Sequence, residues 1–432
     1  MRIAFLTPLP PAPTGIADYA AEVLSLLAGH HEIEVFHGQD RLEADRLPRS
    51  LAIHHAAGFL PRHRARPYDL AVYQMGNAVA HAFLYEPLAR VPGLLVLHDL
   101  VLHHARARAF LESEEALAYA RDPSDPARRA AALPRLRAYR DELAYSYPAQ
   151  AERLFDAHLA TVGDLLPYAY PLFRLPVEAS RVTAVHNQFM AEAVRAEVPS
   201  AQALRIPMAA RAAAVAPDAV HTLRASYGIE RDEIVVGCFG LLTREKRIET
   251  VARAVARAAP HLSRLRLLLV GPVADRSALD ALLSRLGVAA RTVVTGRVPF
   301  WTLPAHIEAA DLVVHLRYPT ARETSAALLR ILAQGRPVIV SDLEHLADIP
   351  DDAVLRVDVT GEEGAVTRAI LRLAESPSAR RRLARAARAF VEREHSPARC
   401  RDGYLAAFET ASQLPDPARG AWPPHWPRAE RS

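Results

Sequence analysis

The sequence predicts an α/β protein that consists of two doubly wound parallel-sheet domains facing a cleft. Short apolar runs alternate with segments of helical periodicity in the first half of the chain, and the same alternation restarts in the second half. A chain of 432 residues also exceeds what one ordinary hydrophobic core covers, so two domains of about 200 residues each are expected.

The first half of the chain is expected to form a domain over residues 1–208. Apolar runs predict strands at 2–6, 33–36, 70–73, 94–98 and 182–186, and the segments after them predict helices at 16–27, 78–88 and 100–112. From about 113 to 168 the pattern is helical only, divided by Pro123, Pro126, Pro134 and Pro148. We expect a helical insertion there, beside the first sheet.

The second half is expected to form a second Rossmann-like domain over 209–395, after a proline-flanked, Ala-rich hinge at 206–218. Its strands are predicted at 234–239, 265–270, 292–295, 312–316 and 337–340. A final helix at 397–413, within a crossover segment at 396–415, is expected to return to the first domain. The tail at 416–432 is rich in Pro, Trp and Arg, and we expect it to be disordered or loosely docked.

The composition is that of a globular protein, with 50% hydrophobic and 24% charged residues and a formal net charge of +4. This mild excess does not indicate a nucleic-acid partner, and it fits an anionic nucleotide or an anionic membrane surface equally well. The cysteines are Cys238 and Cys400, so we expect a reducing compartment without disulfides. The chain starts directly with a strand and has no apolar run of about 18 residues. These features favour a cytoplasmic location, with peripheral contact at the inner face of the membrane left open.

The segment 311–342 has the order strand, charged loop, helix, glycine and strand. Pro319 disfavours a helix within the loop, Thr324 and Ser325 start the helix, and Gly335 ends it. In a parallel sheet, a loop of this kind lies at the carboxyl end of a strand, where ligands bind.

The same loop carries side chains suited to a nucleotide sugar. Free N–H groups at the helix start, together with Arg317 and Arg322, can bind a phosphate. The carboxylate of Glu323 can accept hydrogen bonds from sugar hydroxyl groups. Thr324 and Ser325, which start the helix, are therefore also candidate donor-binding residues.

A second phosphate-binding loop is expected after the strand at 234–239, where the sequence reads GCFGLLTREKRIETVARA. The strand ends at Gly240, and the loop carries Arg244 and Lys246 before an amphipathic helix. Two cations on such a loop can neutralise a diphosphate and stabilise it as a leaving group. A solvated basic loop is the alternative.

In the first domain, two loops at strand ends carry candidate donor- and acceptor-binding residues. The first reads PLPPAPTGIADY, in which Gly15 is a donor-binding candidate, because it lets the backbone approach a ligand closely and the helix start after it offers free N–H groups to phosphate. Asp18 either binds an acceptor hydroxyl or serves as a first-turn acid of the helix. After the strand at 70–73, Asn77 either lines the cleft or caps the following helix. His81 lies one turn further along and can face either way.

The strand at 94–98 ends in His98 and Asp99, and Asp99 is a further acceptor-binding candidate. The local sequence HDLVLHH also contains His103 and His104. These histidines do not share one helical face at i, i+4 spacing, and no carboxylate triad accompanies them, so no metal site is expected.

These motifs, in this order along most of the chain, resemble the retaining glycosyltransferases with the GT-B fold, the glycosyl transferases group 1 related to glycogen and sucrose synthases. The stretch RETSAALLRILAQG resembles their donor-binding loop, GIADY their first loop, and Lys246 the Lys of their second-domain loop. The sequence departs from the family pattern at two positions. Arg330 replaces a Glu that commonly binds the donor ribose, and Leu241 replaces an Arg.

The resemblance implies roles for further residues. His98 would lie against the donor sugar, where its backbone carbonyl or its ring stabilises charge near the anomeric carbon. Arg297 and Val298 would hold the nucleobase through main-chain atoms, and Gly271 would line the same cleft. Arg330 would contact the donor in place of the family Glu. The catalytic group would comprise His98, Lys246, Arg244 and Glu323.

The implied activity is transfer of a sugar from a nucleotide-diphosphate-sugar donor to a glycan, a lipid-linked molecule or a small molecule. Retention at the anomeric carbon is expected, without a metal or other cofactor. Within the same fold, the alternatives are an inverting transferase that uses Asp18 as its base and a sugar-nucleotide epimerase. From another class, a catalytically weak subunit that binds a partner transferase or a glycan is the alternative that Leu241 and Arg330 favour. No G-x-G-x-x-G follows the first strand, so a Rossmann oxidoreductase is not expected.

Overall fold

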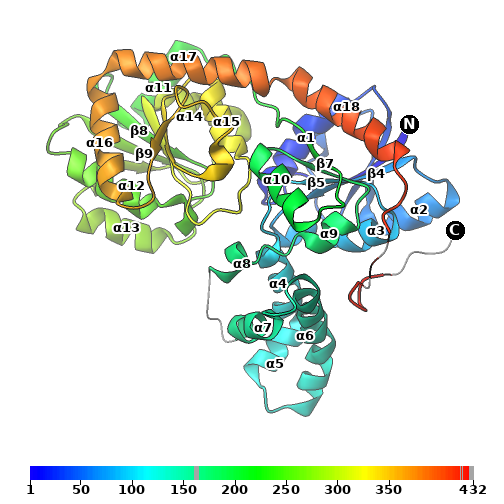
Figure 1. Cartoon of the computed structure of the whole chain (residues 1–432). Coiled ribbons are helices and arrows are strands. Elements are labelled where there is room, and N and C mark those ends of the chain that lie inside the picture. Colours follow the sequence, from blue (N-terminus) through cyan, green and yellow to red (C-terminus); the bar gives the residue numbers. More distant parts are fainter. Residues whose placement is uncertain (160–164, 419, 421, 428–432) are drawn as a thin grey trace. The chain divides into compact units, whose positions relative to one another are not determined.

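The structure is a computed structural model that describes residues 1–159, 165–418, 420 and 422–427. It divides into two compact units. Unit 1 comprises Met1–Pro207, Ala321–Thr324 and Cys400–Ser432, and unit 2 comprises Met208–Thr320 and Ser325–Arg399. Each unit contains a parallel sheet with helices on both faces (Figure 1), which confirms the predicted α/β class.

The sheet of unit 1 is parallel throughout its described strands, in the order β3-β2-β1-β4-β5-β6-β7. Strands β4, β5 and β6 consist of buried residues, because helices cover both faces. The sequence pattern did not predict β3, which contains two histidines, or β7, which has three residues. The strands are β1 (Arg2–Leu6), β2 (Glu32–His37), β3 (Ala52–His55), β4 (Leu70–Met75), β5 (Leu94–Leu97), β6 (Val182–Val185) and β7 (Ala203–Arg205).

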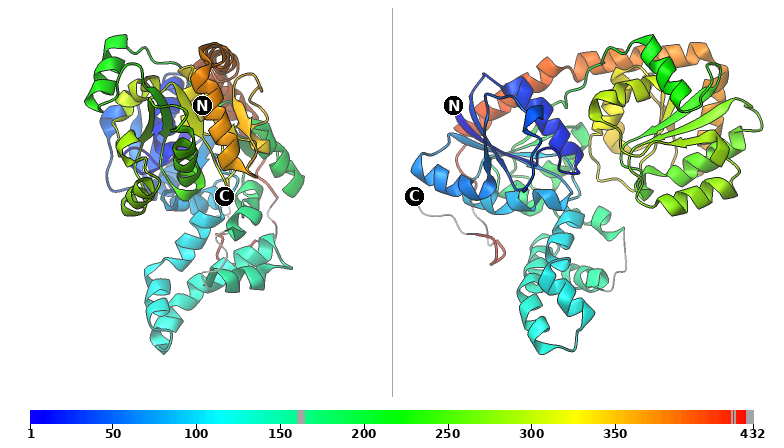
Figure 2. Two further views of the ribbon diagram at one scale, coloured as in Figure 1. Left: turned by 90° about the vertical axis from the view of Figure 1, so that its left-hand side faces the viewer. Right: turned by 180° about the vertical axis from the view of Figure 1, so that it is seen from behind.

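Helices flank this sheet in all three ribbon views (Figures 1 and 2). The predicted helix at 78–88 is instead a 3-10 helix at Val79–Leu84 followed by α3, because Pro87 cannot continue an α-helix through the preceding turn. The predicted helix at 100–112 begins at His103. The helices are α1 (Gly15–Leu27), α2 (Phe59–Ala65), α3 (Tyr85–Arg90), α4 (His103–Leu111), α8 (Leu166–Ala169), α9 (Arg174–Glu178), α10 (Gln188–Glu197) and α18 (Pro397–Gln413).

The helical insertion of unit 1 comprises α5 (Glu114–Arg121), α6 (Pro126–Ser146) and α7 (Ala151–Leu159), which pack together away from the sheet (Figure 2). Tyr139 and Leu143 of α6 belong to a small core of its own. Pro134 does not divide the insertion as predicted, because α6 runs through it and loses only the hydrogen bond that a proline cannot donate. Part of the predicted insertion, residues 160–164, lies outside the described residues.

The sheet of unit 2 is also parallel in its described strands, in the order β10-β9-β8-β11-β12-β13. The predicted strands are present, and β13 is an additional short edge strand. The strands are β8 (Ile234–Phe239), β9 (Leu265–Val270), β10 (Thr292–Val294), β11 (Leu312–His315), β12 (Val338–Ser341) and β13 (Leu355–Val357). The helices are α11 (Pro217–Ser226), α12 (Ile248–Ala258), α13 (Arg276–Arg285), α14 (Leu303–Ala309), α15 (Ala326–Ala333), α16 (Glu362–Glu375) and α17 (Pro377–Glu394).

The described residues of the tail contact unit 1 more closely than predicted. Trp426 is 5% exposed and belongs to the main core of unit 1, where its ring lies edge-on to Tyr85. Its indole N–H donates to Glu142 of the insertion at 2.8 Å, and His425 contacts the same carboxylate at 2.9 Å. Arg106 completes a buried ion pair with Glu142 and holds the pKa of that carboxyl at about 2 despite its burial. The described tail residues are therefore docked on unit 1.

Candidate functional site

The strand order of unit 2 reverses between β8 and β11, so the loops after these two strands meet at a switch point of the sheet. The loop after β8 contains a 3-10 helix at Arg244–Lys246. The N–H of Tyr318, in the loop after β11, donates to the carbonyl of Glu245 at 2.9 Å. The two predicted donor loops are thus hydrogen-bonded to each other within unit 2.

Glycines follow the ends of β8, β9 and β10. Gly240, Gly271 and Gly296 have φ values of 103°, 138° and 69°, which favour glycine. The N–H of Gly271 donates to the carbonyl of Gly296 at 3.0 Å. A Cβ on Gly271 would lie 2.0 Å from the carbonyl oxygen of Gly240, so no side chain fits there. At Gly240, Gly271 and Gly296 these strand ends present backbone without side chains, and we call these three residues the glycine floor.

Lys246 lies at the edge of this glycine floor. The residue is 7% exposed, and its Nζ is 3.6 Å from the point that a Cβ of Gly240 would occupy. Burial raises the pKa of the Cys238 thiol to about 12 and keeps the pKa of His315 well below its ordinary value, so both neighbours are neutral at pH 7. A mostly buried ammonium beside the backbone of Gly240 suits the binding of an anion.

A buried carboxylate supports both loops from below. Glu362, at the start of α16, is 3% exposed and accepts hydrogen bonds from Arg247 at 2.9 Å and from the Ser341 hydroxyl at 3.2 Å. Ser341 in turn accepts from the N–H of Arg317 at 3.1 Å. Arg247 belongs to the loop after β8 and Arg317 to the loop after β11. One carboxylate is therefore linked to both loops, directly to the side chain of Arg247 and through Ser341 to the backbone of Arg317.

Other predicted donor-binding residues of unit 2 are more exposed to solvent than Lys246. Arg244 and Arg297 are exposed, and Val298 is half-buried after β10. Leu241, at the position of the family Arg, is 54% exposed beside Gly240. The loop therefore presents Arg244 and Lys246 differently, the first towards solvent and the second within the protein.

The helix start after β11 has the predicted cap. Ser325 accepts a hydrogen bond from the N–H of Leu328 at 3.3 Å and begins α15. Arg330, which replaces the family Glu on this helix, has its guanidinium 4.9 Å from the centre of the Phe300 ring. The contact is a cation–π arrangement, so the position carries a cation packed on an aromatic ring where the family carries a carboxylate.

Residues 321–324 group with unit 1. The side-chain amide of Asn187 donates to the carbonyl of Arg322 at 3.1 Å and to the hydroxyl of Thr324 at 3.0 Å. The guanidinium of Arg322 lies 5.8 Å from the centre of the Phe189 ring. Glu323 lies between these two anchored residues and is half-buried. Asn187 therefore holds the backbone carbonyl just before Glu323 and the side chain just after it.

The first predicted loop of unit 1 leads into α1. Thr14 caps this helix by accepting from the N–H of Ile16 at 3.3 Å. No atom lies within 4 Å of where a Cβ on Gly15 would be, so the backbone there is open on that side. Asp18 forms an ion pair with Arg46 at 2.8 Å. The acid of the first turn thus has a partner within unit 1.

Asn77 does not cap the helix that follows it, one of the two roles that the sequence left open. Its Oδ1 accepts from the N–H of Ala105 at 3.1 Å, and its Nδ2 lies 3.3 Å from Nδ1 of His104. The side chain therefore caps α4, which is distant in sequence. The N–H of Asn77 donates to Asp99 at 2.8 Å. The structure brings Asn77 and Asp99 together at the switch point between β1 and β4.

His98 belongs to a buried network that the sequence did not predict. Its Nε2 is 2.7 Å from Oε1 of Gln74, and its Nδ1 is 3.1 Å from Nε2 of His186. The hydroxyl of Tyr404 also donates to Gln74, at 3.3 Å. The backbone carbonyl of Gln74 contacts Nδ1 of His81 at 2.9 Å. Burial keeps the pKa of His98 well below its ordinary value, so the ring is neutral.

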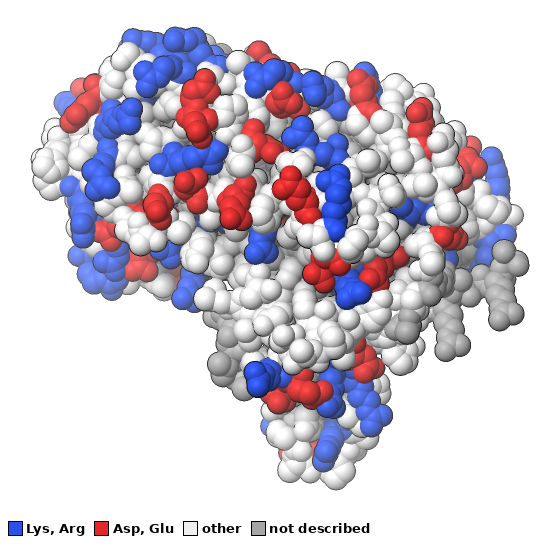
Figure 3. All heavy atoms as spheres, viewed as in Figure 1, with Lys and Arg blue, Asp and Glu red and all other residues white. Residues whose placement is uncertain are grey.

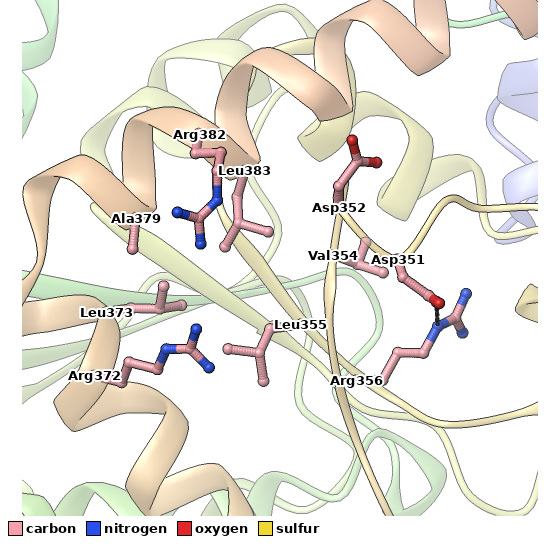
Figure 4. A pocket seen from close by; sticks show the side chains of 10 residues that line it. All are labelled: Asp351, Asp352, Val354, Leu355, Arg356, Arg372, Leu373, Ala379, Arg382 and Leu383. Atoms are coloured by element: carbon pink, nitrogen blue, oxygen red, sulfur yellow. Dashed lines mark hydrogen bonds and ion pairs between the residues drawn. The ribbon is translucent and has the colours of Figure 1, made fainter.

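A pocket of about 550 Å³ in unit 2 lies elsewhere (Figure 4). It is found at the amino end of β13, between α16 and α17, whereas the predicted residues lie at carboxyl ends of strands. Arg372 and Arg382 extend over an apolar floor that includes Leu355 and Leu383. The lining contains no predicted site residue, so the pocket is separate from the switch point.

Surface charge is mixed. Figure 3 shows Lys and Arg side chains interspersed with Asp and Glu side chains on one face. The described residues also form surface ion pairs such as Arg253–Glu249 and Arg257–Glu363. Among the described residues, no group of three or more His, Cys, Asp or Glu side chains is arranged to hold a metal ion. No helix in the described part of the chain is both long and apolar enough to cross a bilayer.

Comparisons with known proteins find similarity in the region that contains the loops after β8 and β11. Residues 233–376 match the model of the family "Glycosyl transferases group 1". An uncharacterized glycosyltransferase of Methanocaldococcus jannaschii is 32% identical over 127 residues. This match covers 29% of the present chain and 32% of the relative, so it spans about a third of that protein.

Solved structures resemble nearly the whole chain. HepE of Anabaena, in complex with UDP and glucose, has a TM-score of 0.65 at 16% identity and covers 96% of this chain and 100% of its own. Sucrose-phosphate synthase of Thermosynechococcus elongatus has a TM-score of 0.64 at 18% identity, with coverage of 95% and 98%. At such identities the likeness shows the fold, which is GT-B.

Proposed function

We propose that this chain, which belongs to the glycosyl transferases group 1 family, transfers a sugar from a nucleoside-diphosphate donor to a hydroxyl group of an acceptor. The donor is proposed to bind at the switch point of unit 2, which lies within the matched residues 233–376. The acceptor is proposed to bind at the switch point of unit 1. A glycan, a lipid-linked molecule and a small molecule are the acceptor classes to test.

The observation that carries the proposal is the placement of Lys246. A buried ammonium beside the glycine floor can neutralise a diphosphate, and it does so most strongly when the sugar–phosphate bond breaks and the leaving group gains charge. Both surrounding loops are linked to Glu362, one through the side chain of Arg247 and the other through Ser341, which supports an arrangement that is organised before a ligand arrives. Arg244, which is exposed, adds positive charge at the rim.

We propose a reaction with retention. The bond between the anomeric carbon and the β-phosphate oxygen breaks, and a bond to the acceptor oxygen forms on the same face of the sugar. The acceptor proton passes to the leaving phosphate oxygen, so no separate base is required. The ring of His98 is neutral, and its role is proposed to be stabilisation of the positive charge near the anomeric carbon by its carbonyl or its ring. Glu323 is proposed to accept hydrogen bonds from the sugar.

UDP-glucose is the first donor to test, because HepE was solved with UDP and glucose. A thermal-shift screen of the whole chain against nucleotide sugars should show a rise in melting temperature with the donor that binds, by mass action. NMR of the glycoside product then gives its anomeric configuration. Inversion, with release of nucleoside diphosphate, would replace the retaining assignment by the inverting alternative.

A catalytically weak subunit is the second candidate, and the positions of Leu241 and Arg330 favour it. The first presents an exposed apolar side chain and the second a cation packed on Phe300, where the family carries an Arg and a Glu. Calorimetry with UDP, GDP and ADP and their glucose conjugates separates the two functions. Binding of a donor with release of its diphosphate supports the transferase, and no binding to any of them supports the subunit.

A further inference from the structure

A point above Gly76 in unit 1 is surrounded by two hydrogen-bond acceptors and a methyl group. A Cβ on Gly76 would lie 2.9 Å from Oδ2 of Asp99, 3.2 Å from Nε2 of His81 and 2.1 Å from Cδ1 of Ile16. Gly76 follows β4, Asp99 follows the end of β5, and Ile16 belongs to the first turn of α1. The point therefore lies at the switch point between β1 and β4.

Nε2 of His81 can accept a hydrogen bond, but no donor among the described residues provides one. Nδ1 is 2.9 Å from the carbonyl oxygen of Gln74, which can only accept, so Nδ1 carries the proton. Burial lowers the pKa of His81 to about 4, and the neutral ring leaves a lone pair on Nε2 at pH 7. His81 is 1% exposed, and within the described residues Nε2 has no hydrogen-bond partner.

The methyl group of Ile16 lies beside the same point as Nε2 of His81, since a Cβ on Gly76 would be close to both. Buried polar atoms are nearly always paired, because an unpaired one loses its hydrogen bond to water without replacement. Ile16 itself is only half-buried, and the backbone just before it, at Gly15, has open space on one side. The side chain can therefore leave this place without disturbing the buried core.

We propose that Asp99 and His81 form the hydroxyl-binding end of the acceptor subsite, and that the side chain of Ile16 covers it until an acceptor displaces the methyl group. This inference rests on the proposed function. One acceptor hydroxyl donates to Nε2 of His81, and a neighbouring hydroxyl donates to the carboxylate of Asp99, which also accepts from the N–H of Asn77. His81 binds and orients the acceptor, and the proton of its Nδ1 stays on the bond to Gln74.

The chemistry of the two groups defines what the subsite takes. Both accept hydrogen bonds and neither donates to this point, so a ligand must bring donors. A sugar ring with neighbouring hydroxyls satisfies both groups. An analogue without the hydroxyl that donates to His81 leaves the buried Nε2 unpaired and is rejected, because a site that is built to bind a hydroxyl discriminates strongly against its absence.

The test uses the full chain, UDP-glucose as donor, and the methyl pyranosides of glucose, galactose and mannose as acceptor probes. UDP release and glycoside product are measured with each probe and with water alone. His81→Phe keeps a ring but removes the lone pair, and should raise KM for the accepted pyranoside about tenfold. Ile16→Ala removes the cover and should lower this KM about threefold.

A double variant makes the test specific to contact between the two residues. If Ile16 acts by covering His81, the gain from Ile16→Ala should disappear in the His81→Phe background. His221→Phe, an exposed histidine on α11 of unit 2, is the control and should match the wild type. If His81→Phe does not fold, the 2-deoxy form of the accepted pyranoside tests the same bond, with an expected loss of about tenfold in kcat/KM.

The outcomes separate the inference from the proposed function. Additive effects in the double variant, or an unchanged kcat/KM for the 2-deoxy probe, overturn the inference while turnover of UDP-glucose upholds the function. Release of UDP to water with no transfer to any of the pyranosides also overturns it, because the subsite then does not take a sugar ring. If the wild type binds no nucleotide sugar, the proposed function fails and the inference fails with it.

Discussion

Each of the two sheets has a switch point where its strand order reverses, and the two switch points differ in the charge of their buried side chains. In unit 2 the buried groups include charged ones, with Lys246 at the glycine floor and Glu362 paired to Arg247. In unit 1 the buried groups at the strand ends are neutral imidazoles, because burial keeps the pKa values of His98 and His81 low. One parallel-sheet architecture thus provides a site for an anion in one unit and a site for uncharged hydroxyl groups in the other.

The largest effect is expected from removing the cation of unit 2. Lys246→Ala should lower the rate of UDP release by about a thousandfold, because a single group that stabilises developing charge in a dry site contributes on this scale. Arg285→Ala, which removes an exposed cation on α13, is the matched control and should leave the rate unchanged. Normal turnover in the Lys246 variant would contradict the assignment of the anion site to the switch point of unit 2.

The next largest effect is expected at the glycine floor. Gly271→Ala places a Cβ 2.0 Å from the carbonyl of Gly240 at a φ of 138°, so the strand ends must separate. Urea unfolding should show a loss of about 3 kcal/mol, together with weaker UDP binding. Gly58→Ala is the control, since its φ is −82° and its nearest neighbour, Arg62, would be 3.8 Å away. Equal losses in both variants would contradict the account of the floor.

Weakening the hydrogen bonds of Glu362 is expected to reduce activity less than changes within the loops after β8 and β11. Glu362→Gln keeps the shape of the side chain but weakens its hydrogen bonds to Arg247 and Ser341, so both loops lose part of their fixed geometry. We expect KM for the donor to rise about tenfold with a smaller change in kcat. Glu363→Gln, at the neighbouring ion pair with Arg257, is the control. An unchanged KM in both variants would show that the loops are ordered without Glu362.

The neutral histidines predict a gradual pH effect on stability. The unfolded chain titrates its histidines near pH 6.5, whereas folded His81 does so at about 4 and folded His98 and His315 well below 6.5. Below pH 6.5 the unfolded state therefore binds more protons, so stability is complete above this pH and falls as the pH decreases towards 4. The urea midpoint should decrease between about pH 7.5 and pH 5. His81→Phe should show a smaller decrease, and a midpoint that rises at low pH would contradict the prediction.

The sequence predicted the features that depend on local pattern. Apolar runs gave the longer strands, and Gly240, Gly271 and Ser325 mark turns and caps with a physical reason at each position. Strands without an apolar run were missed, such as β3 with its two histidines. Pro134 was read as a break because a sequence does not show when packing of Tyr139 and Leu143 compensates for one lost hydrogen bond.

The polar networks were beyond sequence reasoning because their members are far apart in the chain. Gln74, His98 and His186 share no period, and the buried carboxylate of Glu362 resembles an ordinary first-turn acid. One signal was available for Gln74, a polar residue at the end of an apolar strand. The docking of Trp426 had a similar signal, since tryptophans in a polar tail are apolar groups that need a partner.

The most direct measurement is hydrogen–deuterium exchange of the whole chain with and without UDP. A diphosphate bound at the switch point of unit 2 should protect amides of residues 240–247 and 316–320, and the Lys246→Ala variant should lose this protection. Protection confined to residues 351–383 around the separate pocket, or to unit 1 alone, would contradict the assignment of the anion site to the glycine floor and Lys246.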